Sequence, residues 1–160
     1  MGASNYQNSK VVVFQQATVA TGATSATTID TRGERYCSIY VTHQAATAVN
    51  SSAKWTALKL SHGTTTHVSN HTDVTGAVGT TEATATSSQF VLPVHNDTTD
   101  SSVVLFNVDL GKLERILRIE KQATASHSNT SNVIVFHNKP ISPSSDSDRG
   151  ANKSVVIAGP

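Results

Sequence analysis

Cysteine, charged residues and long apolar runs are all scarce in this sequence. Its 160 residues include a single cysteine, Cys37, so no internal disulfide is available and folding in a reducing cytoplasm is acceptable. Charged residues make up 14% of the chain, and the formal net charge is +1. Nucleic-acid-binding chains usually have a strongly basic balance, so we expect no nucleic-acid partner.

Membrane and export signals are also lacking. No stretch approaches the roughly 20 consecutive apolar residues of a membrane-spanning helix. The opening residues, MGASNYQNSK, lack the apolar segment of a secretory signal peptide. We therefore expect no membrane partner. Cys37 lies in an alternating strand pattern, where we expect a small buried hydrophobe rather than a nucleophile.

Recognisable catalytic and cofactor motifs are missing as well. The sequence has no G-x-S-x-G elbow, no glycine-rich phosphate loop and no HExxH zinc helix. Eleven Asp and Glu residues are present, but nothing in the sequence selects the two facing carboxylates that a glycosidase needs. We predict that the protein is not an enzyme, with no catalytic residues and no cofactor.

What the chain does have is the chemistry of β-strands. Serine and threonine make up about a quarter of the residues, and threonine suits a pleated, half-buried surface. Short alternating segments separated by polar turns recur along the chain, which predicts about eight strands. They cover residues 9–19, 26–30, 34–44, 53–61, 88–96, 102–110, 114–123 and 132–138.

This pattern predicts an all-β fold, a single β-sandwich or jelly roll of about eight antiparallel strands. We expect the sandwich at residues 11–138, an N-terminal arm at 1–10 and a C-terminal extension at 139–160. Pro93 falls inside a strand pattern and predicts an edge or a bulge. Alternation assigns twelve residues to the core: Ile39, Val41, Leu58, Leu60, Phe90, Leu92, Phe106, Val108, Leu117, Ile119, Val133 and Val135.

Two segments depart from the alternating pattern. Residues 62–87 are polar and long for a loop in a compact domain, so we expect an irregular excursion or a weak strand around 67–69. Residues 139–160 are a polar tail that becomes apolar again at Val155–Ile157. That short run could dock by β-strand addition, on its own domain or on a neighbour. The alternative is a frayed terminus.

Imidazoles gather in the first of these segments, HGTTTHVSNHTD. His62, His67 and His71 lie close together in the sequence, and Asp73 follows them. Three imidazoles can bind zinc, copper or nickel, but this spacing matches no standard motif. We expect no bound metal and retain these histidines only as weak candidate ligands. In an oligomer, one of them could meet its symmetry mates on an axis and bind an ion there.

Two further groups of charged residues are interpreted as solvated surface and not as binding sites. Asp146 and Asp148 begin like a calcium loop but lack its third ligand and its downstream glutamate, so we expect solvated acids. The basic residues Lys112, Arg115, Arg118 and Lys121 lie near one another, with Asp109, Glu114 and Glu120 interleaved among them. This mixture is typical of a solvated face and not of a phosphate-binding track.

Three stretches resemble small structural proteins of tailed bacteriophages. TIDTRGERYCSIYV, at Thr28–Val41, has an Ile-Asp-Thr-X-Gly turn that leads into an alternating strand. FNVDLGKLERILRIEKQATA, at Phe106–Ala125, repeats this pattern, and WTALKLSHGTTT, at Trp55–Thr66, lies between them. The resemblance covers residues 27–136. Such proteins are similar to capsid decoration (cement) proteins and other head-associated accessory proteins, which have a jelly-roll-like β-sandwich and are commonly trimeric.

The resemblance implies a virion structural protein that binds the outer surface of a phage capsid and stabilises the shell. Its partners would be the major capsid protein and further copies of itself in a homotrimer, and it would be made in the host bacterial cytoplasm. One alternative is a receptor-binding or fibre-tip module for a host surface glycan, which would need exposed aromatics among Trp55, Tyr6, Tyr36 and Tyr40. Another is a hydrolase on a sandwich scaffold, for which no site is visible.

Overall fold

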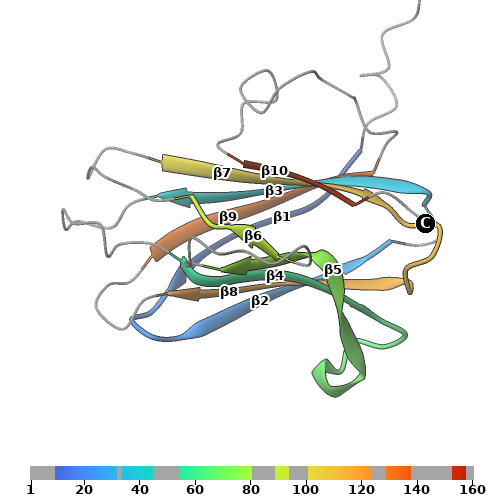
Figure 1. The fold of residues 1–160 in the computed structure, drawn as a ribbon, viewed down its shortest axis with the longest axis horizontal. Coiled ribbons are helices and arrows are strands. Elements are labelled where there is room, and N and C mark those ends of the chain that lie inside the picture. The colour runs from blue at the N-terminus through green and yellow to red at the C-terminus, as the bar shows by residue number, and fades with distance from the viewer. Residues whose placement is uncertain are drawn as a thin grey trace, which may run out of the picture.

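The described part of the chain is an all-β sandwich, as predicted. The structure is a computed structural model that describes residues 10–31, 34–44, 55–80, 89–93, 101–123, 129–137 and 153–157. These residues form ten strands, and their only helical element is a 3-10 turn at Val68–Asn70. The strands lie in two layers that pack face to face (Figure 1).

Each sheet contains five strands. The first sheet, in spatial order, consists of β1 (Lys10–Val19), β9 (Asn129–His137), β3 (Tyr36–Gln44), β7 (Ser101–Asp109) and β10 (Lys153–Ile157). The second sheet, in spatial order, consists of β2 (Thr24–Asp30), β8 (Ile116–Ala123), β4 (Trp55–Gly63), β5 (His71–Thr80) and β6 (Gln89–Val91). We call them the first sheet and the second sheet below.

Eight of these strands have the jelly-roll topology. In the first sheet β1, β9, β3 and β7 are neighbours, and in the second β2, β8, β4 and β5 are neighbours, with every pair antiparallel. The chain changes sheet at each step from β1 to β4 and again from β7 to β9. The predicted antiparallel jelly roll is therefore confirmed, and β6 and β10 are additions to it.

The two additional strands run parallel to their neighbours. β10 pairs with β7 in the register Val155 to Phe106, and β6 pairs with β5 in the register Phe90 to Gly79. The apolar run in the predicted tail thus docks by β-addition on its own domain. Its central side chain, Val155, is buried in the sandwich core. Pro93 follows β6, which is the last strand of its sheet, in line with the edge predicted there.

All twelve predicted core residues are buried, and they belong to one continuous hydrophobic cluster between the sheets. The period-2 alternation of each strand places these side chains on the face that meets the opposite sheet. Phe106 and Phe90 meet edge to face, with ring centroids 5.8 Å apart. Removal of this apolar surface from water is the main stabilising contribution to such a fold.

The expectation of an irregular excursion after residue 62 is wrong over much of that segment. His71–Thr80 form β5, a ten-residue strand, and the 3-10 turn takes the place of the weak strand expected at 67–69. Alternation is lost in β5 because its pairing with β4 shifts at a bulge and because it contains two glycines. At Gly79 a Cβ atom would lie 2.6 Å from Leu92, so only glycine allows this close packing.

Candidate functional site

Two corners of the sandwich carry the motifs on which the phage resemblance rests. At the first corner, residues 30–35, the chain leaves β2 and crosses to β3 in the other sheet. Glu34 N–H donates to Thr31 O at 2.9 Å and closes a turn there. At the second corner, residues 109–115, the chain leaves β7 and crosses to β8. Gly33, the glycine of the Ile-Asp-Thr-X-Gly turn, lies outside the described residues.

The arginine of each corner binds the aspartate of the other. Arg115 donates two hydrogen bonds to Asp30, at 2.7 Å from Nε and 2.6 Å from Nη2. Arg35 Nε lies 2.9 Å from Oδ1 of Asp109. The backbone N–H of Gly111, together with Arg35, lowers the pKa of Asp109. Both arginine side chains are 64% exposed, so water and salt screen these ion pairs.

Further hydrogen bonds to the backbone join the same two corners. The Thr31 hydroxyl donates to Arg115 O at 2.7 Å, and the Thr31 N–H donates to the same oxygen at 3.1 Å. Leu110 N–H donates to Arg35 O at 2.8 Å. A Cβ atom at Gly111 would lie 2.8 Å from the Arg35 guanidinium carbon, so a side chain there would displace the arginine. The two motifs therefore form a structural joint between the two corners, with one set of contacts beside β2 and β8 and the other beside β3 and β7.

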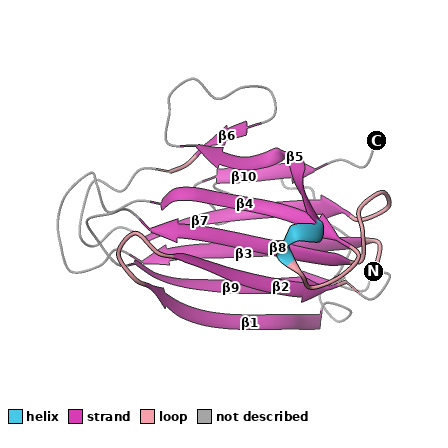
Figure 2. Cartoon of the chain, turned by 90° about the horizontal axis from the view of Figure 1, so that it is seen from below, coloured by secondary structure: helices cyan, strands magenta, loops and turns pink. Residues whose placement is uncertain are grey.

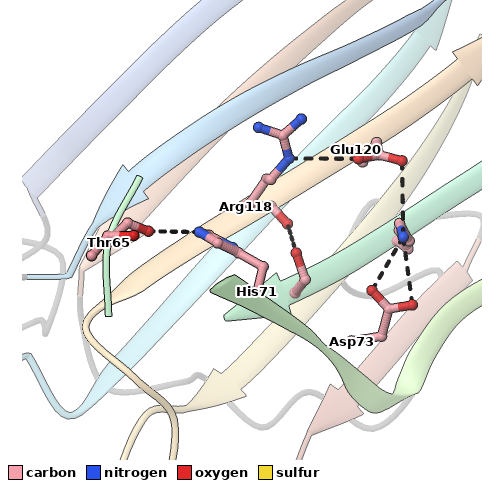
Figure 3. Close-up of polar contacts among 7 residues, drawn as sticks. Thr65, His71, Asp73, Arg118 and Glu120 are labelled. Atoms are coloured by element: carbon pink, nitrogen blue, oxygen red, sulfur yellow. Dashed lines mark hydrogen bonds and ion pairs between the residues drawn. The ribbon is translucent and has the colours of Figure 1, made fainter. Parts of the chain in front are cut away.

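A chain of alternating charges crosses the outer face of the second sheet (Figure 3). Lys59 Nζ lies 3.2 Å from Asp73 and 3.9 Å from Glu120, and Arg118 Nε lies 3.5 Å from Glu120. The cross-strand register brings these groups together, because Lys59 stands opposite Glu120. Opposite charges alternate across this face, as expected for the mixed solvated surface. Lys121, which the sequence also assigned to that surface, is instead fully buried.

Each of the three candidate metal-binding histidines makes its own local hydrogen bond. His62 Nδ1 accepts from the Glu114 N–H at 3.1 Å, and His67 Nδ1 lies 2.8 Å from the Ser69 hydroxyl. His71 Nε2 donates to Thr65 O at 2.7 Å, as Figure 3 shows. The bonds of His67 and His71 lie within the loop between β4 and β5, whereas the bond of His62 joins β4 to the second corner.

The structure does not assemble a metal centre from the described residues. Within these residues, no three His, Cys, Asp or Glu side chains are placed as ligands of one ion. Asp146 and Asp148, the start of the incomplete calcium loop, lie outside the described residues. The described histidines act through hydrogen bonds that any suitable polar side chain could make.

A lysine and a serine form a polar pair inside the sandwich. Lys121, from β8, points inward because it has the same parity as Leu117 and Ile119. Its Nζ donates to the Ser131 hydroxyl of β9 at 3.0 Å, and both side chains are fully buried. Burial lowers the pKa of Lys121 to about 8 from its ordinary value of 10.5, because a charged amine loses its hydration there.

This pair has the composition of a Ser–Lys catalytic dyad but not its accessibility. A deprotonated lysine beside a serine hydroxyl can act as a general base. Both side chains have 0% solvent exposure, so a substrate carbonyl cannot reach the serine oxygen in this structure. On the same side of the core, the His43 ring packs 4.9 Å from the Trp55 ring, centroid to centroid. The polar groups are enclosed and do not line an open site.

The remaining candidates are also enclosed. Trp55 is 2% exposed and is part of the core. Cys37 is fully buried, as the strand pattern predicted, and burial raises the pKa of its thiol to about 12. A thiol that is neutral and inaccessible is a poor nucleophile.

No model of a known protein family matches the chain, and no curated protein matches it either. No helix in the described part of the chain is long and apolar enough to cross a membrane.

Proposed function

We propose that this chain is a structural protein of a bacteriophage virion that binds the outer capsid surface and stabilises the shell. Its partners in this proposal are the major capsid protein and further copies of itself, as a homotrimer. Several weak contacts from one rigid trimer would give strong overall attachment, because the second and third contacts form at high effective concentration.

The observation that supports this proposal most is the reciprocal joint between the two corners. The two motifs that resemble phage head proteins hold the two corners together here, through Asp30 with Arg115 at the edge of the second sheet and Asp109 with Arg35 at the edge of the first. A jelly roll fixed in this way is a rigid scaffold, which a decoration protein needs in order to connect several subunits. Reactive groups play no part in that role, and the described Lys121–Ser131 pair is enclosed.

The glycan-binding alternative receives less support. Sugar rings stack on exposed aromatic faces, and the single tryptophan, Trp55, is used in the core. Tyr36 and Tyr40 are half-buried on the outer face of the first sheet, where Tyr40 packs edge to face against Phe136. We therefore prefer the capsid role to the receptor-binding role.

Co-sedimentation tests the proposed function. Empty shells of the phage that encodes this chain, assembled without it, are mixed with the purified chain and pelleted. We expect saturable binding, and shells with the chain bound should open at a higher temperature than bare shells. A chain that stays in the supernatant at high concentration would refute the capsid role, and binding on a glycan array would then favour the alternative.

A further inference from the structure

The sandwich has two narrow sides, and their strand edges differ. On one side the sheets end in the short strands β10 and β6, of five and three residues. On the other side they end in β1 and β2, of ten and seven residues, and no described strand pairs with the outer edges of these two. Figure 2 shows β1 at one margin of the molecule and β6 and β10 toward the opposite margin.

The two long edges lie next to each other, one from each sheet. A short turn joins β1 to β2, closed by the Ala23 N–H donating to Ala20 O at 2.9 Å. Across the sandwich, the Thr27 hydroxyl donates to the Gln15 side-chain oxygen. We call the surface formed by the outer edges of β1 and β2 the β1–β2 side. It presents two different strand edges in a fixed relative position.

Along most of their length, the two long edges lack the usual protection against pairing with another strand. Natural edge strands are blunted by charged residues, proline, bulges or shortness. Residues 11–19 of β1 and 24–29 of β2 include no charged residue and no proline. β1 has one bulge, between Val11 and Val13, and its register with β9 is regular from Val13 to Val19. Such edges are suited to accept another strand through backbone hydrogen bonds.

We propose that the β1–β2 side is the surface through which copies of this chain associate, with β1 of one copy pairing with β2 of the next. A second copy is the occupant that fits, because each copy supplies both kinds of edge and a head-to-tail contact uses both of them. Such heterologous contacts form a closed ring when the rotation between copies closes. The charged residues of the two strands stand only at their ends, at Lys10 and Asp30, so a contact between residues 11–19 and 24–29 buries no unpaired charge. The inference rests on the self-association in the proposed function and not on capsid binding.

Two variants with the same four altered positions test the contact. Gln16 and Thr18 on β1, and Thr24 and Thr28 on β2, are all exposed. In the first variant all four become lysine, so like charges face each other across the contact, which destabilises strand pairing. In the second, Gln16→Lys and Thr18→Lys are combined with Thr24→Glu and Thr28→Glu, so the facing charges attract. Within one chain the two sets lie on opposite outer faces, so both variants should fold.

Light scattering after size exclusion gives the mass of each protein. For the wild type we expect about 50 kDa, three chains of 16.8 kDa. The all-lysine variant should fall to the mass of a single chain, with its strand circular dichroism kept. The charge-paired variant should keep the wild-type mass at low salt. If both variants keep the wild-type mass, the proposed contact is wrong, although the capsid role stands and co-sedimentation still tests it.

Hydrogen exchange of the wild type gives an independent test that needs no variant. In a strand, alternate backbone N–H groups point to opposite edges, so half of those in β1 and β2 point to the β1–β2 side. We expect these amides to exchange slowly in the oligomer and to become fast on dilution to the monomer. Two results would overturn the inference. One is slow exchange of these amides that persists in the monomer. The other is a wild type that stays monomeric when its concentration is raised about 100-fold.

Discussion

The two ends of the sandwich core are filled by different chemistry, although the same strands run through both. Near the corner joint, with His137 as a buried polar exception, most of the inward residues are apolar and buried: Ile29, Cys37, Val108, Leu110, Leu117 and Val135. At the opposite end, beside the apolar Trp55 and Ala123, several inward residues are polar while remaining buried: His43, Ser102, Lys121 and Ser131. We call these the apolar end and the polar end.

This difference shows that burial and hydrophobic stabilisation are separate properties. At the apolar end, burial of apolar surface stabilises the folded state by on the order of 25 cal/mol for each Å² removed from water. The polar end loses part of that gain, because a buried amine gives up its hydration and recovers only the hydrogen bond to Ser131. The stability of the fold therefore comes mainly from the apolar part of the core, and the corner joint adds a smaller contribution.

The largest effect on stability should come from truncation of a large side chain in the apolar core. Phe106→Ala removes a fully buried ring that packs against Phe90, and we expect a loss of about 3–5 kcal/mol from the free energy of unfolding, since a cavity remains. Urea denaturation measures this loss. Val91→Ala is the matched control, because Val91 is 39% exposed. A loss at Phe106 no larger than at Val91 would contradict the proposed importance of this region.

At the polar end, a substitution should increase the stability of the fold. Lys121→Met keeps a long side chain but removes the buried amine, so we expect a gain on the order of 2–3 kcal/mol at pH 7. The unfolded chain holds the lysine proton up to about pH 10.5, whereas the folded chain releases it near pH 8. Between these values the unfolded state binds more protons, so wild-type stability should rise with pH. In Lys121→Met this rise should be absent.

Cys37 acts against this trend at higher pH. Its pKa is about 12 in the folded chain against an ordinary value of 9.0, so the folded state keeps a proton that the unfolded state loses above pH 9. That contribution lowers stability as the pH rises from about 9 to about 12. The lysine effect is therefore best measured between pH 8 and 9, as the difference between wild type and Lys121→Met. Parallel stability curves for the two proteins would show that Lys121 does not titrate as stated.

A smaller effect should follow from loss of the buried hydrogen bond in the corner joint. Thr31→Val keeps the shape of the side chain but removes the hydroxyl that donates to Arg115 O. We expect a loss of about 1 kcal/mol, the usual net value of one such bond. Thr28→Val at an exposed position is the control. Equal unfolding midpoints for the two variants would show that the Thr31 hydroxyl does not stabilise the joint.

The smallest effect should come from the exposed ion pair above it. Asp30→Asn weakens the bond with Arg115, and we expect a slight fall in the thermal midpoint at low salt. Because salt screens exposed charges, the difference from wild type should shrink toward zero at high salt. A difference that does not respond to salt would mean that Asp30 acts through something other than its charge.

Much of the fold follows from alternation in the sequence. The parity of each strand identified the twelve core residues, because a strand with one buried face must place every second side chain inward. The same parity extends from Leu117 and Ile119 to Lys121, so the signal for the buried lysine was present. The parity of Lys121 was not taken as evidence of burial, because lysine is rarely fully buried.

The rest depended on contacts between segments distant in sequence. β5 was missed because its bulge and glycines remove the period-2 signal. The pairing of Asp30 with Arg115, 85 positions later, cannot be read from either motif alone. Each motif looks like an ordinary turn with a nearby arginine, and only the jelly-roll topology brings the two corners together.

The nested order of the strands also has a consequence for synthesis. β1 pairs with β9, and β2 pairs with β8, so the first strands to leave the ribosome must wait for nearly the last. Such distant pairings make folding slow, and β1 stays without its partner until β9 has been made. The newly made chain therefore runs its greatest risk of aggregation before β9 emerges. Slower translation should lengthen that risk, and an early-acting chaperone should relieve it.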